Sequence, residues 1–537
     1  MSFAVNRRRA LFMLTSAATI GAGLAATPGW AGALVSAFAQ AVSAAAQDDE
    51  GLSAFYSTHN YATLWTGAGD VARRHSLMAA LETAPAHGLP VVRYDAAALR
   101  DLFAAARTEG DVGRLEVAMS KAYLAFVRDI ASGALVPSSV EVGIKRAVMR
   151  PDPAMALYAA TQDGFDAFLA ALPPAAPEYA RLMKEKFALE AIIARGGFGP
   201  QVGADRVAEG ETGAAVVQVR DRLVTLGYLG RSFSGSYDAL IAEAVQRFQL
   251  DHGLTATGTA DEATIAALNV QAEGRLKSVV VAMERLRWMG NAPRGTRHIW
   301  VNLPSFVARV VDDGKVSFKT RVVIGKVGRD TESPEFSDQM EFMVVNPSWS
   351  VPRSITVKEY LPMMKRNANA QGQLQVINSQ GRVVPRAEID FAAYTPQNFP
   401  FALRQPPSDG NALGKVKFMF PNENNIYLHD TPSKSLFDKE VRAFSHGCIR
   451  VGAPFDLAYF LLAPQAADPK ELFRSYLTTG RESVLNFVDP IPVHLVYFTA
   501  WPTEQGLIGY LNDVYGRDAL IYQALEEAGV VLAGVQS

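Results

Sequence analysis

Cys448 is the only cysteine among the 537 residues, and two of the eight histidines, His429 and His446, lie shortly before it. A thiolate is the nucleophilic form of cysteine, whereas the free thiol has a pKa of about 8.5. A neighbouring imidazole can take the thiol proton and stabilise the anion as an ion pair. These residue types at this spacing predict nucleophilic catalysis by Cys448 with a histidine as the base.

The residues next to Cys448 are suited to holding a substrate. In an extended segment, residues two positions apart share a face, so His446 and Arg450 are expected beside the sulfur. Gly447 lets the backbone approach a substrate closely, and the amides of Gly447 and Cys448 could stabilise an oxyanion. Arg450 could lower the thiol pKa or bind a substrate carboxylate. The alternative is a small buried cysteine with structural histidines nearby.

The segment Ser445-His446-Gly447-Cys448-Ile449-Arg450, preceded by His429, resembles the signature of the L,D-transpeptidases with a YkuD-type catalytic domain. The resemblance implies that Cys448 is the nucleophile, that His429 is the general acid/base, and that the backbone carbonyl of Asp430 orients His429. It also implies substrate-binding or oxyanion-stabilising roles for six residues: Ser445, His446, Gly447, Arg450, Trp349 and Arg404.

Strands must position this segment. Runs rich in β-branched residues predict strands, and Asp312-Asp313-Gly314 predicts a hairpin turn. A strand over 426–429 would place His429 at its end, and a helix is expected from Pro454 to Leu462. The other strands are expected over 299–303, 306–311, 320–324, 340–345, 418–421, 484–488 and 493–498.

These strands fit the mainly β catalytic domain of the resembled family, here residues 297–500. The β pattern lapses over about 353–400, which the resemblance identifies as a capping insertion over the active site. Trp349 lies in an Asn-Pro-x-Trp-x-Val-Pro element and is assigned either to the substrate groove or to the core. Arg404-Gln405-Pro406-Pro407 departs from the family pattern, because Pro407 stands where a glycine is commoner.

The first half of the chain is mainly helical. Residues 40–50 suggest a linker, and residues 50–200 resemble the helical scaffold region of larger Gram-negative members of the family. Stripes at three- and four-residue spacing predict buried helix faces, for example Leu115, Met119, Ala122, Phe126 and Ile130. Residues 211–270 contain three helical segments and resemble a three-helix peptidoglycan-binding domain, with a generic three-helix unit as the alternative.

Residues 1–39 suggest an export signal, because Arg7-Arg8-Arg9 precedes an apolar run and Ala37-Phe38-Ala39 offers a small-residue cleavage site. The arginines resemble a twin-arginine signal, while the general secretory route and an uncleaved anchor remain alternatives. No other apolar run is long enough to span a membrane, so a soluble mature protein in the periplasm is expected. Residues 501–537 suggest a C-terminal tail, helical over 519–528, without visible chemistry.

Composition excludes some function classes. The net charge is −2 and charged residues make up 20% of the chain, so nothing indicates binding to nucleic acid. The sequence lacks a Cys/His set with the spacing of a metal site, and no cofactor is expected. A single cysteine in an exported chain cannot form an internal disulfide, which favours a chemical role for Cys448.

The expected fold is a multidomain α+β protein: a mainly β YkuD-type catalytic domain, a helical scaffold and a three-helix peptidoglycan-binding domain. The resemblance implies acyl transfer from a tetrapeptide stem of peptidoglycan to an acceptor amine, giving 3-3 cross-links between diaminopimelate residues, and inhibition by carbapenems. Alternatives are an L,D-carboxypeptidase or hydrolase, a lipoprotein-attaching variant, a sortase-like transferase, and a non-catalytic scaffold that binds peptidoglycan peptides and glycan.

Overall fold

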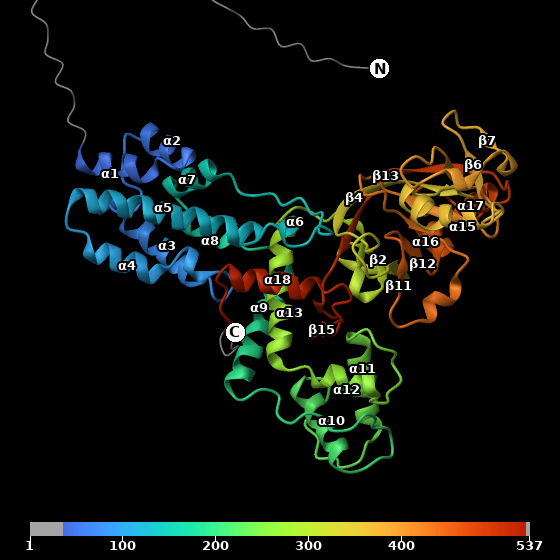
Figure 1. Ribbon diagram of the computed structural model, residues 1–537. Helices are drawn as coiled ribbons and strands as arrows, with labels where there is room; N and C mark the ends of the chain where they lie inside the picture. Colours follow the sequence, from blue (N-terminus) through green and yellow to red (C-terminus); the bar gives the residue numbers. More distant parts are fainter. Residues whose placement is uncertain (1–35, 533–537) are drawn as a thin grey trace, which may run out of the picture.

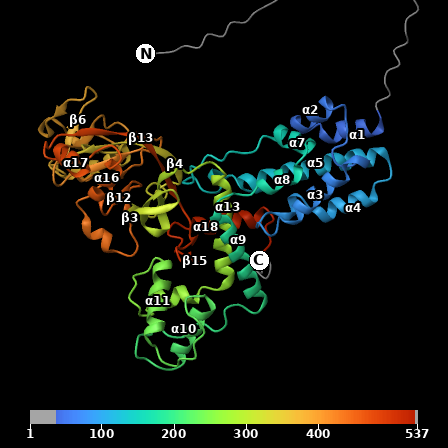
Figure 2. The ribbon, with the colours of Figure 1, turned by 180° about the vertical axis from the view of Figure 1, so that it is seen from behind.

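The computed structural model describes residues 36–532, which form three lobes around a central group of helices (Figures 1 and 2). The chain builds a helical lobe, then a small three-helix lobe, and then a lobe rich in strands that contains Cys448. The predicted multidomain α+β class is confirmed. Most of the predicted export signal lies outside the described residues.

The helical lobe is organised around the long helix α5 (Glu109–Ser132), which begins with a capping box formed by Thr108 and Asp111. The stripe predicted from Leu115 to Ile130 is buried against the surrounding helices. The other helices are α1 (Ala37–Ala46), α2 (Glu50–Thr58), α3 (Val71–Glu82), α4 (Ala96–Ala105), α6 (Pro137–Val140), α7 (Pro153–Thr161), α8 (Phe165–Ala171) and α9 (Pro177–Ala194).

The linker expected over 40–50 is wrong, because most of that segment belongs to α1. Ser36 caps this helix, and Val42 and Ala46 are fully buried. Alanine is the best helix former, so the composition that suggested a linker favours a helix. The helix packs closely on α5 at Gly113, where a Cβ atom would lie 2.6 Å from the carbonyl oxygen of Phe38. Cleavage after Ala39 would therefore remove the first turn of a packed helix.

The three-helix lobe contains α10 (Ala214–Thr225), α11 (Ala239–Asp251) and α12 (Glu262–Asn269). Phe248 is buried in its core, and the neighbouring Gln249 is buried as well. The Gln249 amide donates to the Thr259 carbonyl at 2.8 Å and accepts from the Gly258 amide at 3.0 Å. Gln249 thus fixes the loop that leads into α12.

Helix α13 (Ala272–Met289) forms the junction of the three lobes and contacts α5, α9 and α18. Its second half is buried on all sides, and the charged residues there are paired. Arg287 Nη2 bonds Glu284 Oε2 at 2.8 Å, and Arg285 bonds Glu335 and Asp518. The C-terminal segment belongs to this junction through the hairpin β14 (Ala500–Pro502) and β15 (Ile508–Tyr510) and through α18 (Arg517–Glu527).

The strand-rich lobe is a nine-stranded sheet in the order β11-β3-β12-β10-β9-β4-β13-β1-β2, and it closes on itself because β2 also pairs with β3. The two strands expected over 484–488 and 493–498 are one strand, whose register shifts between Asn486 and Ile491. The strands are β1 (Arg297–Asn302), β2 (Val307–Asp312), β3 (Lys315–Gly325), β4 (Phe336–Val345), β9 (Val416–Met419), β10 (Leu428–His429), β11 (Ala443–Ser445), β12 (Ile449–Val451) and β13 (Ser483–Val496).

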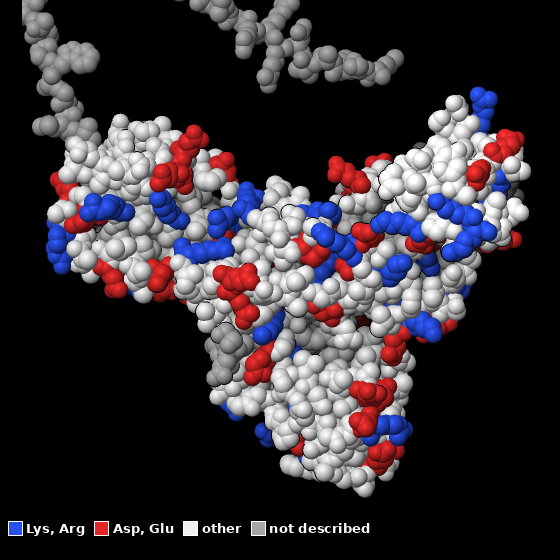
Figure 3. All heavy atoms as spheres, viewed as in Figure 1, with Lys and Arg blue, Asp and Glu red and all other residues white. Residues whose placement is uncertain are grey.

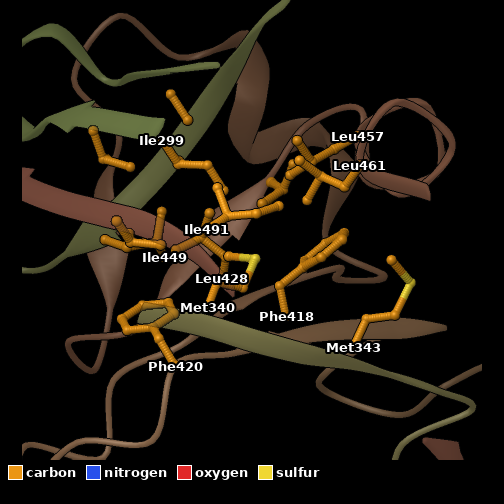
Figure 4. Packing of buried hydrophobic residues seen from close by; sticks show 14 of the residues in the cluster. Ile299, Met340, Met343, Phe418, Phe420, Leu428, Ile449, Leu457, Leu461 and Ile491 are labelled. Atoms are coloured by element: carbon orange, nitrogen blue, oxygen red, sulfur yellow. The ribbon is translucent and has the colours of Figure 1, made fainter. Parts of the chain in front are cut away.

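The inside of this closed sheet is a hydrophobic core (Figure 4). Phe418, Leu428 and Ile449 point into it from three adjacent strands, and α16 (Pro454–Leu462) and α17 (Pro469–Leu477) cover it. Side chains alternate between the two faces of a strand. The neighbours of Leu428 and Ile449 along their strands must therefore point away from the core.

A capping unit is inserted between β4 and β9. Its four-stranded sheet, in the order β5-β8-β6-β7, packs on short helices around a separate core that includes Leu361 and Leu403. The sequence analysis found no strand pattern over about 353–400. That prediction is only partly right, because two of the short strands lie within this range. The elements are β5 (Trp349–Ser350), α14 (Arg353–Ile355), the π-helical turn η4 (Thr356–Tyr360), α15 (Leu361–Arg366), β6 (Gln375–Ile377), β7 (Val383–Val384) and β8 (Ala402–Gln405).

Charged side chains of both signs are interspersed over the face shown in Figure 3, in keeping with the small net charge. Among residues 36–532, none of the helices has the length and apolar character that crossing a bilayer requires.

Candidate active site

Cys448 immediately precedes β12, and the pairing of β12 with β10 determines its neighbours. The two strands are parallel, with Leu428 opposite Ile449 and His429 opposite Arg450. Because Leu428 and Ile449 face the core, His429 and Arg450 share the outer face. Cys448 retains partial exposure to solvent. The structure thus brings the predicted nucleophile, base and arginine together on one side of two short strands.

The His429 ring has a defined orientation. Its side chain is buried, and Nδ1 lies 2.5 Å from the backbone carbonyl oxygen of Asp430. A carbonyl can only accept, so Nδ1 carries the proton and Nε2 has the free lone pair. The Asp430 carboxylate is itself fixed, because it accepts from the Lys415 amide at 2.8 Å. This arrangement leaves Nε2 available as a base.

The resting pair is neutral. Burial, together with the nearby Arg450 guanidinium, lowers the pKa of His429 to about 3, because both disfavour the imidazolium. Burial raises the pKa of the Cys448 thiol to about 11, against the opposing effects of Tyr427, Arg450 and Lys417. The thiol lies 3.6 Å from the Asn425 carbonyl oxygen as a donor. Desolvation thus outweighs the nearby cations, and the thiol pKa lies above its usual value instead of below it.

This neutral pair gives a prediction for thiol reactivity. Alkylation of Cys448 by iodoacetamide should accelerate about tenfold per pH unit from pH 7 to 10, because only the thiolate reacts and its pKa is about 11. The rate is measured by mass spectrometry of the intact protein at each pH. A rate that is already constant near neutral pH would instead reveal a thiolate–imidazolium pair.

Tyr427 is a site residue that the sequence reasoning missed. It lies two positions before His429 on the same strand face, and the two rings meet edge to face with centroids 5.6 Å apart. Its hydroxyl lies within hydrogen-bonding reach of the Cys448 thiol and of the Trp349 indole, and its backbone amide also faces the sulfur. Both groups are donors that can stabilise a thiolate. Residues two positions apart on a strand share a face, so the position of Tyr427 relative to His429 was the signal in the sequence that could have identified it.

Two cations, Arg450 and Lys417, face the site; neither forms a salt bridge within residues 36–532, although the charge of Glu482 acts on Lys417. Burial lowers the pKa of Arg450 and of Lys417, which stands opposite His429 on β9. The Nε atom of Arg450 is buried and makes no hydrogen bond within residues 36–532. A buried guanidinium without a partner is costly. An anionic group of a ligand would supply the missing acceptor.

The backbone around Cys448 is held by two serines. Ser445 Oγ donates to the Cys448 carbonyl at 2.6 Å and accepts from the Gly447 amide at 3.2 Å. The Gly447 amide is thus occupied, which differs from the expectation that two amides face an oxyanion. Within residues 36–532 the Cys448 amide has no hydrogen-bond acceptor, so it is the backbone donor that remains available. The second serine, Ser333, donates to the Gly447 carbonyl at 2.6 Å.

The capping unit contacts the nucleophile loop. His446 Nε2 lies 2.7 Å from Glu359 Oε1 of η4, so His446 links the loop to the cap. Trp349 is half-buried at the base of the cap and packs edge to face on Tyr360. Arg404 lies on β8, where it donates to Ser348 Oγ at 2.8 Å, and it makes no contact with Cys448 or His429.

The described residues contain no group of three or more His, Cys, Asp or Glu side chains that could hold a metal ion. The site itself presents a thiol, an oriented imidazole, a free amide donor and two cations.

Three protein-family models match parts of the chain. One of them covers the closed sheet that carries the thiol and the oriented imidazole. Residues 296–481 match the L,D-transpeptidase catalytic domain, residues 50–185 match the scaffold domain, and residues 212–268 match the "Putative peptidoglycan binding domain". Residues 296–481 thus form a domain of the YkuD-type L,D-transpeptidase catalytic family.

Individual relatives cover the chain in part. A Haemophilus influenzae protein named "Putative L,D-transpeptidase" is 35% identical over 240 residues, which are 44% of this chain and 47% of that protein. The match thus spans about half the length of this curated relative.

Two crystal structures of L,D-transpeptidases, from Xylanimonas cellulosilytica and Stackebrandtia nassauensis, each align with 55% of this chain at 16% identity. The alignment covers 98% of the Xylanimonas chain and 96% of the Stackebrandtia chain. The TM-scores are 0.16 and 0.22, at which the likeness supports no conclusion about this chain.

Proposed function

We propose that this protein is a periplasmic, cell-wall-associated peptidoglycan L,D-transpeptidase that forms 3-3 cross-links between stem peptides. The observation that carries the proposal is the shared strand face of Cys448 and His429, with the Nδ1 atom of His429 engaged by the Asp430 carbonyl. Cys448 is the nucleophile, His429 is the general acid/base, and the Asp430 carbonyl orients the imidazole. No cofactor takes part in the reaction.

The reaction proceeds in two acyl transfers. Cys448 Sγ attacks the carbonyl carbon that precedes the terminal D-alanine of a tetrapeptide stem, while His429 Nε2 takes the thiol proton. The oxyanion is stabilised by the Cys448 amide, with the Tyr427 hydroxyl close by. His429 passes its proton to the amine of the departing D-alanine, and a thioester remains. The amine of a second stem then attacks the thioester, loses a proton to His429, and the thiol is restored.

The neutral resting state of Cys448 and His429 is compatible with this order of reaction steps. Burial lowers the pKa of His429 and raises that of Cys448, so both groups rest neutral and proton transfer to His429 accompanies attack on the substrate carbonyl. The thiol is thereby protected from unproductive reactions between turnovers. Trp349, Ser445 and His446 shape the substrate site around the sulfur, and Gly447 allows the substrate to approach the backbone.

Arg450 and Lys417 are assigned to a carboxylate of the stem peptide, because both are cations close to the sulfur and neither forms a salt bridge within residues 36–532. Arg404 is assigned to the outer part of the substrate site. The three-helix lobe, residues 212–268, is assigned to binding of peptidoglycan, glycan included, close to the reaction.

The test is a product analysis. The purified protein is incubated with a disaccharide-tetrapeptide from a diaminopimelate-containing wall, and the products are separated and weighed. A cross-linked dimer that has lost one D-alanine, with the new bond between two diaminopimelate residues, is expected. Release of D-alanine without any dimer would replace the proposal with an L,D-carboxypeptidase. No release by an intact protein would leave a peptidoglycan-binding scaffold.

A variant of Arg450 separates substrate binding from stability. Arg450→Met should lower kcat/KM for the tetrapeptide by about tenfold to a hundredfold, because one charge-assisted contact is lost. The melting temperature should stay the same or rise, because the substitution removes the Arg450 Nε atom, which is buried and makes no hydrogen bond within residues 36–532. Arg474→Met, at an exposed position on α17, is the control that should change neither quantity. Full activity of Arg450→Met would exclude the assignment.

A further inference from the structure

The C-terminal segment, outside the matched catalytic domain of residues 296–481, reaches the loop that supports Cys448. The connection passes through the loop between β3 and β4, which follows Gly325 and contains Ser333. Ser333 is fully buried, accepts from the Gly325 amide at 2.9 Å and donates to the Gly447 carbonyl at 2.6 Å. Ser333 is thus the contact between the β3–β4 loop and the peptide bond before Cys448.

That contact determines where the Cys448 amide points. The Gly447–Cys448 peptide bond is trans, so its carbonyl and its N–H point in opposite directions. Holding the Gly447 carbonyl on Ser333 therefore directs the Cys448 N–H away from the β3–β4 loop. The space at this contact is tight, because a Cβ on Gly447 would lie 3.2 Å from Ile426 Cδ1 and 3.6 Å from the Glu332 carbonyl oxygen.

Two residues of the C-terminal segment hold Ser333 in place. The Tyr515 hydroxyl donates to the Gly325 carbonyl at 2.6 Å and accepts from the Ser333 amide at 3.2 Å, so it joins both sides of the loop. Arg517 is fully buried and donates to the Ser333 carbonyl at 3.0 Å. It also bonds Glu332 at 3.2 Å, and its guanidinium stacks on the Tyr515 ring at 4.8 Å.

We propose that Tyr515 and Arg517 are positioning residues for acyl transfer at Cys448: acting through Ser333, they orient the Cys448 amide as the oxyanion donor. The inference rests on the proposed function. Neither residue touches the sulfur or the imidazole, and neither shifts the thiol toward its anion. Their effect is on the geometry of one peptide bond, so it concerns only reactions that form an oxyanion.

This distinction supplies the test. Acylation of Cys448 by meropenem forms an S–C bond, passes through an oxyanion and breaks the β-lactam C–N bond, with the thiol proton passing to the ring nitrogen. Alkylation by iodoacetamide displaces iodide from carbon and forms no oxyanion. The rate constants of both reactions are measured on the full chain by intact-protein mass spectrometry, for the wild type and for Tyr515→Phe.

Tyr515→Phe should slow meropenem acylation about tenfold or more and leave alkylation unchanged, because a small misplacement of a donor costs rate. Tyr123→Phe is the matched control: its hydroxyl also donates to a backbone carbonyl at 2.6 Å, from Tyr123 to Ala156, but in the helical lobe. It should leave both rates unchanged.

Ser333→Ala provides a second variant. It should also slow acylation selectively, and the double variant Ser333→Ala/Tyr515→Phe should be no slower than the slower single variant, because Tyr515 acts through Ser333. An unchanged acylation rate in Tyr515→Phe, or equal slowing of acylation and alkylation, would overturn the inference while the proposed function stands. A wild type that is alkylated but never acylated would overturn both.

Discussion

Replacing Cys448 by alanine should abolish the covalent adduct with a carbapenem and all cross-linking activity. Cys448 is the only thiol in the chain, so no other residue can form the thioester. The wild type should gain the mass of one carbapenem molecule, and Cys448→Ala should gain none. The fold should persist, because a partly exposed side chain contributes little to the core.

The control for that experiment is the melting curve. Cys448→Ala should melt within about 2 °C of the wild type, which would show that the lost adduct reflects chemistry and not unfolding. An adduct that still forms on Cys448→Ala would place the nucleophile at another residue. A wild-type protein that is intact and takes no adduct would favour a non-catalytic role in wall binding.

Replacing His429 by alanine should lower cross-linking by about a hundredfold to ten-thousandfold, the usual contribution of a positioned general base. The reason is specific to this site: the thiol pKa is about 11, so almost no thiolate exists at neutral pH without a base beside it. The rate is measured as D-alanine release from the tetrapeptide, with the melting curve as a check on folding.

His446→Ala is the comparison that decides which histidine is the base. His446 bonds Glu359 of the cap, so its loss should have a smaller effect, expressed mainly in KM. If His446→Ala were inactive and His429→Ala active, the roles would be reversed. If both variants were nearly inactive, the contact between the cap and the nucleophile loop would be as important as the base.

Much of the architecture was predictable because its signals are local. Runs rich in β-branched residues predicted most strands of the closed sheet, and Pro454 marked the beginning of α16. Errors arose where composition was ambiguous: the alanine-rich residues 40–50 form much of α1 rather than a linker, and one bulged strand was divided into two. The C-terminal residues suggested a tail, but α18 packs on α13, and Arg517 and Asp518 are buried there.

The sequence by itself determined which residues are candidates for the chemistry: a single thiol, a histidine before it and an arginine after it, in a pattern that resembles a known family. Only the tertiary structure decided the state of those groups. The pKa of Cys448 depends on Tyr427, Arg450 and Lys417 and on the removal of water, and the support of its backbone depends on Tyr515, far along the chain. Sequence patterns report on neighbours a few positions apart, whereas desolvation and hydrogen bonding depend on whatever atoms the fold brings near.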